Sequence, residues 1–152
     1  MSDSGRTHLK RFAVLVKSNA QVEAGTMPTE QDLTAMTRFN DELVESGAML
    51  AGEGFLASTE GARLTYTDGG VRTRSGPFDD PESLVAGYWI IQAASLDDAI
   101  ELMKRAPMGG GTLEIRRIAE AEDFGEELTP ELRDREERQR GQMEENARRR
   151  AA

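Results

Sequence analysis

The sequence predicts an α+β domain of the ferredoxin-like βαββαβ type, with a hairpin inserted between its second and third core strands. Two amphipathic helical patterns, each flanked by apolar strand-like segments, predict the alternating order. A third observation, Asp68-Gly69-Gly70 between two strand-like segments, predicts the hairpin. We expect this domain over residues 9–118, preceded by a disordered N-terminus at residues 1–8 and followed by a charged, partly helical tail at residues 119–152.

The first strand and the first helix have clear signals. Residues 10–17 are apolar on both strand faces, so we expect this strand to lie centrally in the sheet. The helix begins at Thr29, where Asp32 completes an imperfect capping box, and it ends at Gly47. Its apolar stripe repeats at helical spacing and comprises Leu33, Met36, Phe39, Leu43 and Val44.

The middle of the domain is rich in turn signals. Residues 48–55 are apolar and contain glycines, which indicates a short strand that leads into an irregular turn. Residues 63–67 and 71–74 are the two strands of the hairpin, because glycine supplies the positive φ that a tight turn needs. A loop follows over residues 75–82.

The last part of the domain repeats the strand, helix and strand order. An apolar strand at residues 87–94 leads to a helix that Ser95 caps and that ends before Pro107. A final strand covers residues 112–118. The stripe of this helix comprises Leu96, Ala99, Ile100 and Met103.

The apolar faces of the central strands have a consequence for assembly. In this topology both helices cover the same face of the sheet, yet residues 10–17 and 87–94 are apolar on both faces. The other face therefore needs a second cover, and a second copy of the chain is the simplest one. We expect a homodimer.

Composition excludes several classes of function. The chain has 19 basic and 28 acidic residues, and its net charge of −9 disfavours general binding to nucleic acids and to anionic membranes. It has no cysteine and a single histidine, His8, so we expect no thiolate or multi-histidine metal site and no cofactor. Because it has neither a signal-peptide core nor an apolar run of roughly 20 residues, we expect a cytoplasmic protein.

The tail has its own composition. Residues 119–152 contain 11 acidic residues and 7 arginines. Their apolar groups are too few to form a core unaided. Thr129-Pro130 is a typical helix start. The tail is then either a solvated helix or a docking arm for a partner protein, with Leu128 and Leu132 as anchors.

Several motifs appear in order along residues 10–118. The most specific is Ser75-Gly76-Pro77-Phe78, with the carboxylate of Asp80 two residues later. The others are Gly52-Glu53-Gly54-Phe55, Gly87-Tyr88-Trp89, Leu96-Asp97-Asp98-Ala99 and Leu113-Glu114-Ile115-Arg116-Arg117-Ile118. Together they resemble the YCII-related family, whose signature is Asp-Gly-Pro-Phe.

The resemblance implies a dimeric α/β barrel in which two ferredoxin-like sheets face each other. It also implies a small enzyme, with a His–Asp pair in the broader family, and a link of some relatives to alternative sigma factors of bacterial RNA polymerase. In this chain Ser75 stands at the position of the leading aspartate of the motif. His8 lies before the first strand, outside the matched segments.

The residues of the Ser75–Phe78 loop have two interpretations. Gly76 and Pro77 fix a turn, and Phe78 either fills one end of the core or forms the wall of a ligand pocket. In the second interpretation Ser75, Gly76, Pro77, Phe78 and Tyr88 bind a small organic molecule.

Two carboxylates are the candidate catalytic residues. Glu53, between two glycines and near Leu50 and Phe55, is either an exposed acid or a partly desolvated general base with a raised pKa. Asp80 would anchor a polar group of the ligand. The sequence thus favours a dimeric YCII-related protein with a small-molecule pocket, and the alternative is a non-catalytic regulatory module linked to transcription.

Overall fold

The computed structural model describes residues 8–151, so the disorder expected for the N-terminus concerns residues outside this range, His8 excepted. The chain forms two compact units, one that ends at Ile118 and one that begins at Ala119.

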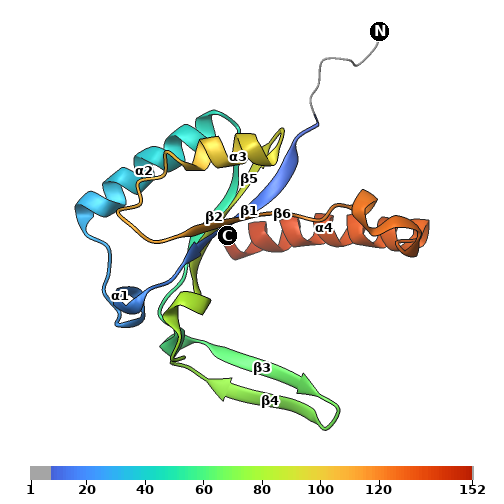
Figure 1. The fold of residues 1–152 in the computed structure, drawn as a ribbon. Coiled ribbons are helices and arrows are strands. Elements are labelled where there is room, and N and C mark those ends of the chain that lie inside the picture. Colours follow the sequence, from blue (N-terminus) through green and yellow to red (C-terminus); the bar gives the residue numbers. More distant parts are fainter. Residues whose placement is uncertain (1–7, 152) are drawn as a thin grey trace. The chain divides into compact units, whose positions relative to one another are not determined.

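The first unit is built on a four-stranded antiparallel sheet (Figure 1). The order of its strands is β2-β5-β1-β6, which confirms an α+β fold consistent with the ferredoxin-like type. The two central strands are β1 and β5, as expected from their apolar faces. The strand bounds are β1 at Lys10–Lys17, β2 at Met49–Gly54, β5 at Val85–Ala93 and β6 at Leu113–Arg117.

Two helices, α2 (Glu30–Glu45) and α3 (Leu96–Met103), pack on one face of this sheet (Figure 1). The capping box of α2 is confirmed, because Thr29 N–H donates to Asp32 Oδ2 and Asp32 N–H donates to Thr29 Oγ1, both at 3.1 Å. Ser95 caps α3 by accepting a hydrogen bond from Asp98 N–H. Local sequence signals therefore set where both helices begin.

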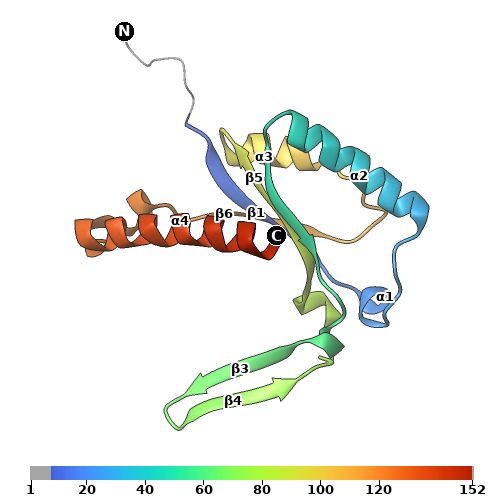
Figure 2. The same ribbon diagram turned by 180° about the vertical axis from the view of Figure 1, so that it is seen from behind.

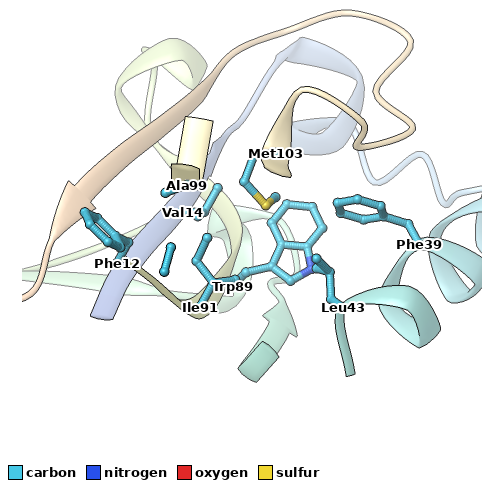
Figure 3. Packing of buried hydrophobic residues seen from close by; sticks show 9 residues of the cluster. Phe12, Val14, Phe39, Leu43, Trp89, Ile91, Ala99 and Met103 are labelled. Atoms are coloured by element: carbon cyan, nitrogen blue, oxygen red, sulfur yellow. The ribbon is translucent and has the colours of Figure 1, made fainter. Parts of the chain in front are cut away.

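The core lies between these helices and the sheet (Figure 3). The indole of Trp89 on β5 meets the ring of Phe39 edge-on, with 6.0 Å between ring centroids. Its Nε1–H donates a 2.9 Å hydrogen bond to Asn40 Oδ1, so the polar atom of this buried side chain is satisfied. The other buried members of the cluster are Phe12, Val14, Leu43, Ile91, Ala93, Ala99 and Met103.

Some residues of the predicted apolar stripes are not buried. Leu33 and Val44 of α2 and Leu96 of α3 are 54%, 60% and 49% exposed. The contact of α2 with the sheet is centred on Phe39 and Leu43, and Leu33 and Val44 lie at the margins of that stripe. The expected stripe was therefore wider than the surface that the helix buries.

The inserted hairpin consists of β3 (Ala62–Thr67) and β4 (Gly70–Ser75). These two strands form a separate two-stranded antiparallel sheet. Figure 2 shows it projecting from the end of the four-stranded sheet. The 3-10 turn η1 (Ser58–Glu60) lies where the sequence predicted an irregular turn after the short strand. The short helix α1 (Ala20–Glu23), which the sequence patterns did not predict, lies in the same unit.

The second unit contains η3 (Ala121–Glu127) and the helix α4 (Pro130–Ala151). Thr129 Oγ1 accepts a 3.3 Å hydrogen bond from Leu132 N–H at the start of α4. No residue of α4 is buried. Over residues 8–151, none of the helices combines the length and the apolar character that a membrane span requires.

Candidate functional site

A cavity of about 710 Å³ lies between two connecting segments of the first unit. One segment, residues 19–32, links β1 to α2 and includes α1; the other, residues 54–60, follows β2. Most of the surface of the cavity is apolar, and its apolar side chains include Val22, Met27, Pro28, Phe55, Leu56 and Ala57. Its size and lining match those of sites for small organic molecules.

A second cavity, of about 460 Å³, shares part of this lining. Residues 54–57 and Glu60 line both cavities, and Leu84 and Val85 contribute only to the second. Its polar residues include Glu23 and Ser58, and Ser58 contacts the 75–78 loop. The segment 54–60 is thus the structural element on which both cavities depend.

Hydrogen bonds fix this segment from two sides. The carboxylate of Glu23 accepts a 2.6 Å hydrogen bond from the Ser58 hydroxyl. It also accepts the Ser58 N–H, which lies 3.1 Å from Oε1 and 3.2 Å from Oε2. The Ser58 hydroxyl in turn accepts a 3.0 Å hydrogen bond from Phe78 N–H. All three residues are buried or half-buried. Because Glu23 belongs to α1, Ser58 to η1 and Phe78 to the 75–78 loop, these hydrogen bonds connect the three segments.

Gly76 gives the reason for glycine at the second position of the motif. A Cβ at this position would lie 1.7 Å from the carbonyl oxygen of Ser58, a separation that no side chain can occupy. Gly76 N–H donates a 3.0 Å hydrogen bond to the carbonyl of Gly61, and the Gly76–Pro77 peptide is cis. The loop therefore packs its backbone directly against the η1 turn.

Phe78 is buried at the base of the hairpin. The Arg63 guanidinium lies 3.9 Å from the centroid of its ring, and that of Arg74 lies 5.5 Å away. Residues 75–78 do not appear in the linings of the two cavities above, which other residues form. The loop therefore contacts the lining of the cavity of about 460 Å³ through Ser58. Its predicted ligand-binding residues are Ser75, Gly76, Pro77 and Phe78.

Tyr88 and Glu53 are placed together. They are direct partners in the pairing of β2 with β5, and both line a smaller cavity of about 260 Å³. The Tyr88 ring also lies 5.7 Å from that of Phe55, measured between centroids. Glu53 is exposed in the single chain, so the desolvation expected from its apolar neighbours is not present there.

Asp80 lies apart from this pair, at the hairpin base. Its Oδ1 is 3.8 Å from the Arg63 guanidinium. A hydrogen bond with the Ser83 side chain lowers the pKa of Asp80 most. Desolvation raises the pKa and is the next largest effect, and a backbone hydrogen bond and then the charges of Arg63 and Arg74 lower it further. A carboxylate with a lowered pKa is a weak base, so this environment suits a polar anchor better than a proton acceptor.

Sequence patterns did not point to Glu23 and Ser58, the most tightly hydrogen-bonded polar pair of this region. They are 35 residues apart in the chain, and neither belongs to a motif with a local signature. Within residues 8–151, no three histidine, aspartate or glutamate side chains are arranged to hold a metal ion.

The fold and these cavities define a small α+β domain with an inserted hairpin and a recess beside its 54–60 segment. Comparison with known proteins matches residues 11–122 to the YCII-related domain, and the chain belongs to that family. It is also 27% identical over 116 residues to an uncharacterized protein of Rhizobium meliloti (strain 1021), a match that covers 71% of this chain and 91% of that protein.

Proposed function

We propose that this YCII-related protein binds a small organic molecule in the cavity of about 710 Å³ between residues 19–32 and 54–60. The supporting observation is a largely apolar recess of ligand size with a few polar side chains at defined places. The Ser75–Phe78 loop then acts as a support, since Phe78 N–H bonds the hydroxyl of Ser58 behind the cavity wall.

A cavity-filling variant tests this function. Thr26 lines the cavity and is exposed, so Thr26→Trp places a bulky ring in it without disturbing the core. Thr65→Trp, on the exposed hairpin strand β3, is the matched control. In a fragment screen followed by amide NMR, compounds that shift residues 54–57 should lose binding to Thr26→Trp and keep it with Thr65→Trp. Fragments that bind both variants equally would argue against this cavity.

The same proposal includes a homodimer formed through the sheet face opposite α2 and α3. Trp89 and Ile91 of β5 point to the helices, so the alternating Tyr88 and Ile90 belong to the other face, together with Ala13 and Leu15 of β1. A second copy would cover these apolar groups. Light scattering should then give about twice the chain mass of 16.7 kDa, and a mass of one chain at micromolar concentration would refute the dimer.

The dimer bears on the role proposed for Glu53. Because Glu53 pairs with Tyr88 in register, it belongs to the face that the second copy would cover. Partial burial there would remove part of the water around its carboxylate, the environment that the proposed general base needs. Glu53 lines the smaller cavity of about 260 Å³ and not the ligand cavity itself, so Glu53→Gln should leave ligand binding at residues 54–57 unchanged. Unchanged turnover by this variant would exclude the catalytic role.

The alternative function is that of a regulatory module that binds a partner protein through the tail. It is favoured by α4, which buries none of its residues and exposes Leu132 and Met143 at 44% and 57%. Removal of residues 124–152 followed by a pull-down tests this alternative. Loss of specific partners relative to the full chain would support it, and an unchanged set of partners would exclude the docking role.

A further inference from the structure

We infer that the ligand of the cavity of about 710 Å³ is an organic cation, with an ammonium or guanidinium group on an apolar body. This inference rests on the proposed function, because it concerns the same cavity. It adds the sign of the charge on the ligand and the side chains that select it.

The charged side chains of the cavity have one sign. Asp32 and Glu60 line it, and its remaining lining residues are neutral. The adjoining cavity adds Glu23 and shares Glu60, again without a basic residue in its lining. An anionic ligand would therefore meet carboxylates with no compensating cation, whereas a cation would be attracted.

The two arginines at the hairpin base, Arg63 and Arg74, contact other partners. Arg63 lies over the Phe78 ring at 3.9 Å and against Asp80 at 3.8 Å. Arg74 lies over the same ring, at 5.5 Å. The two guanidinium groups thus belong to the hairpin base, and neither appears among the lining residues of the cavity.

The apolar part of the cavity is exposed in the single chain. Met27, Phe55 and Leu56 are 69%, 47% and 67% exposed, although all three line the cavity. An apolar body would cover them, and methionine can adjust its shape to different bodies. The face of the Phe55 ring is also a favourable neighbour for an ammonium group.

Three probes with one carbon skeleton separate the contribution of charge from that of the apolar body. They are 2-naphthylmethylamine, 2-naphthylmethanol and 2-naphthoate, titrated into the uniformly labelled full chain with the amides of residues 54–57 as reporters. We expect the amine to bind at least about threefold tighter than the alcohol, with the carboxylate weakest. The preference for the amine should shrink as salt is raised from low ionic strength.

Two variants test whether the carboxylate of Glu60 causes the preference for the amine. Glu60→Gln should lower the ratio of amine to alcohol affinity, with Asp32 retaining part of the preference, and it should leave the binding of the alcohol unchanged. Glu45→Gln removes the same charge at the far end of α2, outside the cavity lining, and should keep the ratio of the unmodified chain.

The outcomes distinguish this inference from the proposed function. Equal binding of amine and alcohol, or tightest binding of the carboxylate, would overturn the cation inference and leave the cavity as a binding site. A preference for the amine that Glu60→Gln does not alter would also overturn it. If none of the three probes shifts residues 54–57, the proposed function fails together with the inference.

Discussion

The hydroxyl of Ser58 donates a 2.6 Å hydrogen bond to the carboxylate of Glu23, across 35 positions of the chain. The same hydroxyl accepts a 3.0 Å hydrogen bond from Phe78 N–H. One small side chain therefore holds α1 and the 75–78 loop to the turn that forms the cavity wall. Both partners of Ser58 would lose a hydrogen bond if its hydroxyl were removed.

Ser58→Ala should lower the free energy of unfolding by about 1–3 kcal/mol, because it leaves the part-buried N–H of Phe78 without its acceptor. Urea unfolding followed by circular dichroism measures this change. Ser75→Ala, an exposed serine of the neighbouring motif, is the control and should stay within about 0.5 kcal/mol of the unmodified chain. Equal effects of the two substitutions would contradict a structural role for the Ser58 hydroxyl.

Gly76→Ala should be still more damaging, since its Cβ would lie 1.7 Å from the Ser58 carbonyl oxygen. The backbone must move apart, and we expect a loss of about 3 kcal/mol, the upper range for overpacking. Gly69→Ala is the matched control in the hairpin turn, where the nearest atom to the new Cβ is 4.0 Å away. Thermal unfolding compares the two variants, and an unchanged melting temperature for Gly76→Ala would disprove the close approach.

Features encoded in short stretches were predictable from the sequence. The Thr29 capping box and the Asp68-Gly69-Gly70 turn each depend on three or four consecutive residues, and the structure has both. The α+β class followed from the order of such stretches. Leu33 and Val44 were assigned to the buried stripe because periodicity shows which face of a helix is apolar but not how wide a strip its neighbour covers.

The candidate site was only partly predictable. Tyr88 and Glu53 come together because pairing of β2 with β5 makes them neighbours, which a sequence motif for each strand cannot show. Glu23 meets Ser58 because two surface connections converge, and no local pattern records such a convergence. The 75–78 motif drew attention to its own residues, whereas the cavity lies on the other side of the turn that this motif supports.

Asn40→Ala should destabilise the core although Asn40 itself is only half-buried. It removes the acceptor of the 2.9 Å hydrogen bond from the buried Trp89 indole, and an unpaired buried donor costs about 1–3 kcal/mol. Trp89 is the single tryptophan, so its fluorescence reports unfolding of this region directly. Asp41→Ala, the exposed neighbour on α2, is the control and should have little effect. An Asn40→Ala variant as stable as the control would mean that water replaces the amide.

Asp80 should titrate in the folded chain below its ordinary pKa of 3.8, because Ser83 and then Arg63 and Arg74 favour its charged form. A group with a lowered folded pKa adds stability above its unfolded pKa, and this contribution disappears as the pH falls through the folded pKa. The effect on unfolding is therefore confined to acid below about pH 4. Near neutral pH the carboxylate stays charged, as a polar anchor requires.

The cause of this shift can be assigned by carboxyl ¹³C NMR titration. Ser83→Ala should raise the pKa of Asp80 toward 3.8 by more than Arg63→Gln does, since the hydrogen bond with Ser83 is the larger contribution. Ser95→Ala removes a helix cap at α3 and serves as a control that should leave the titration of Asp80 unchanged. If Arg63→Gln had the larger effect, the ion pair at 3.8 Å rather than the Ser83 hydrogen bond would set the charge of Asp80, and its role as an anchor would depend on the hairpin.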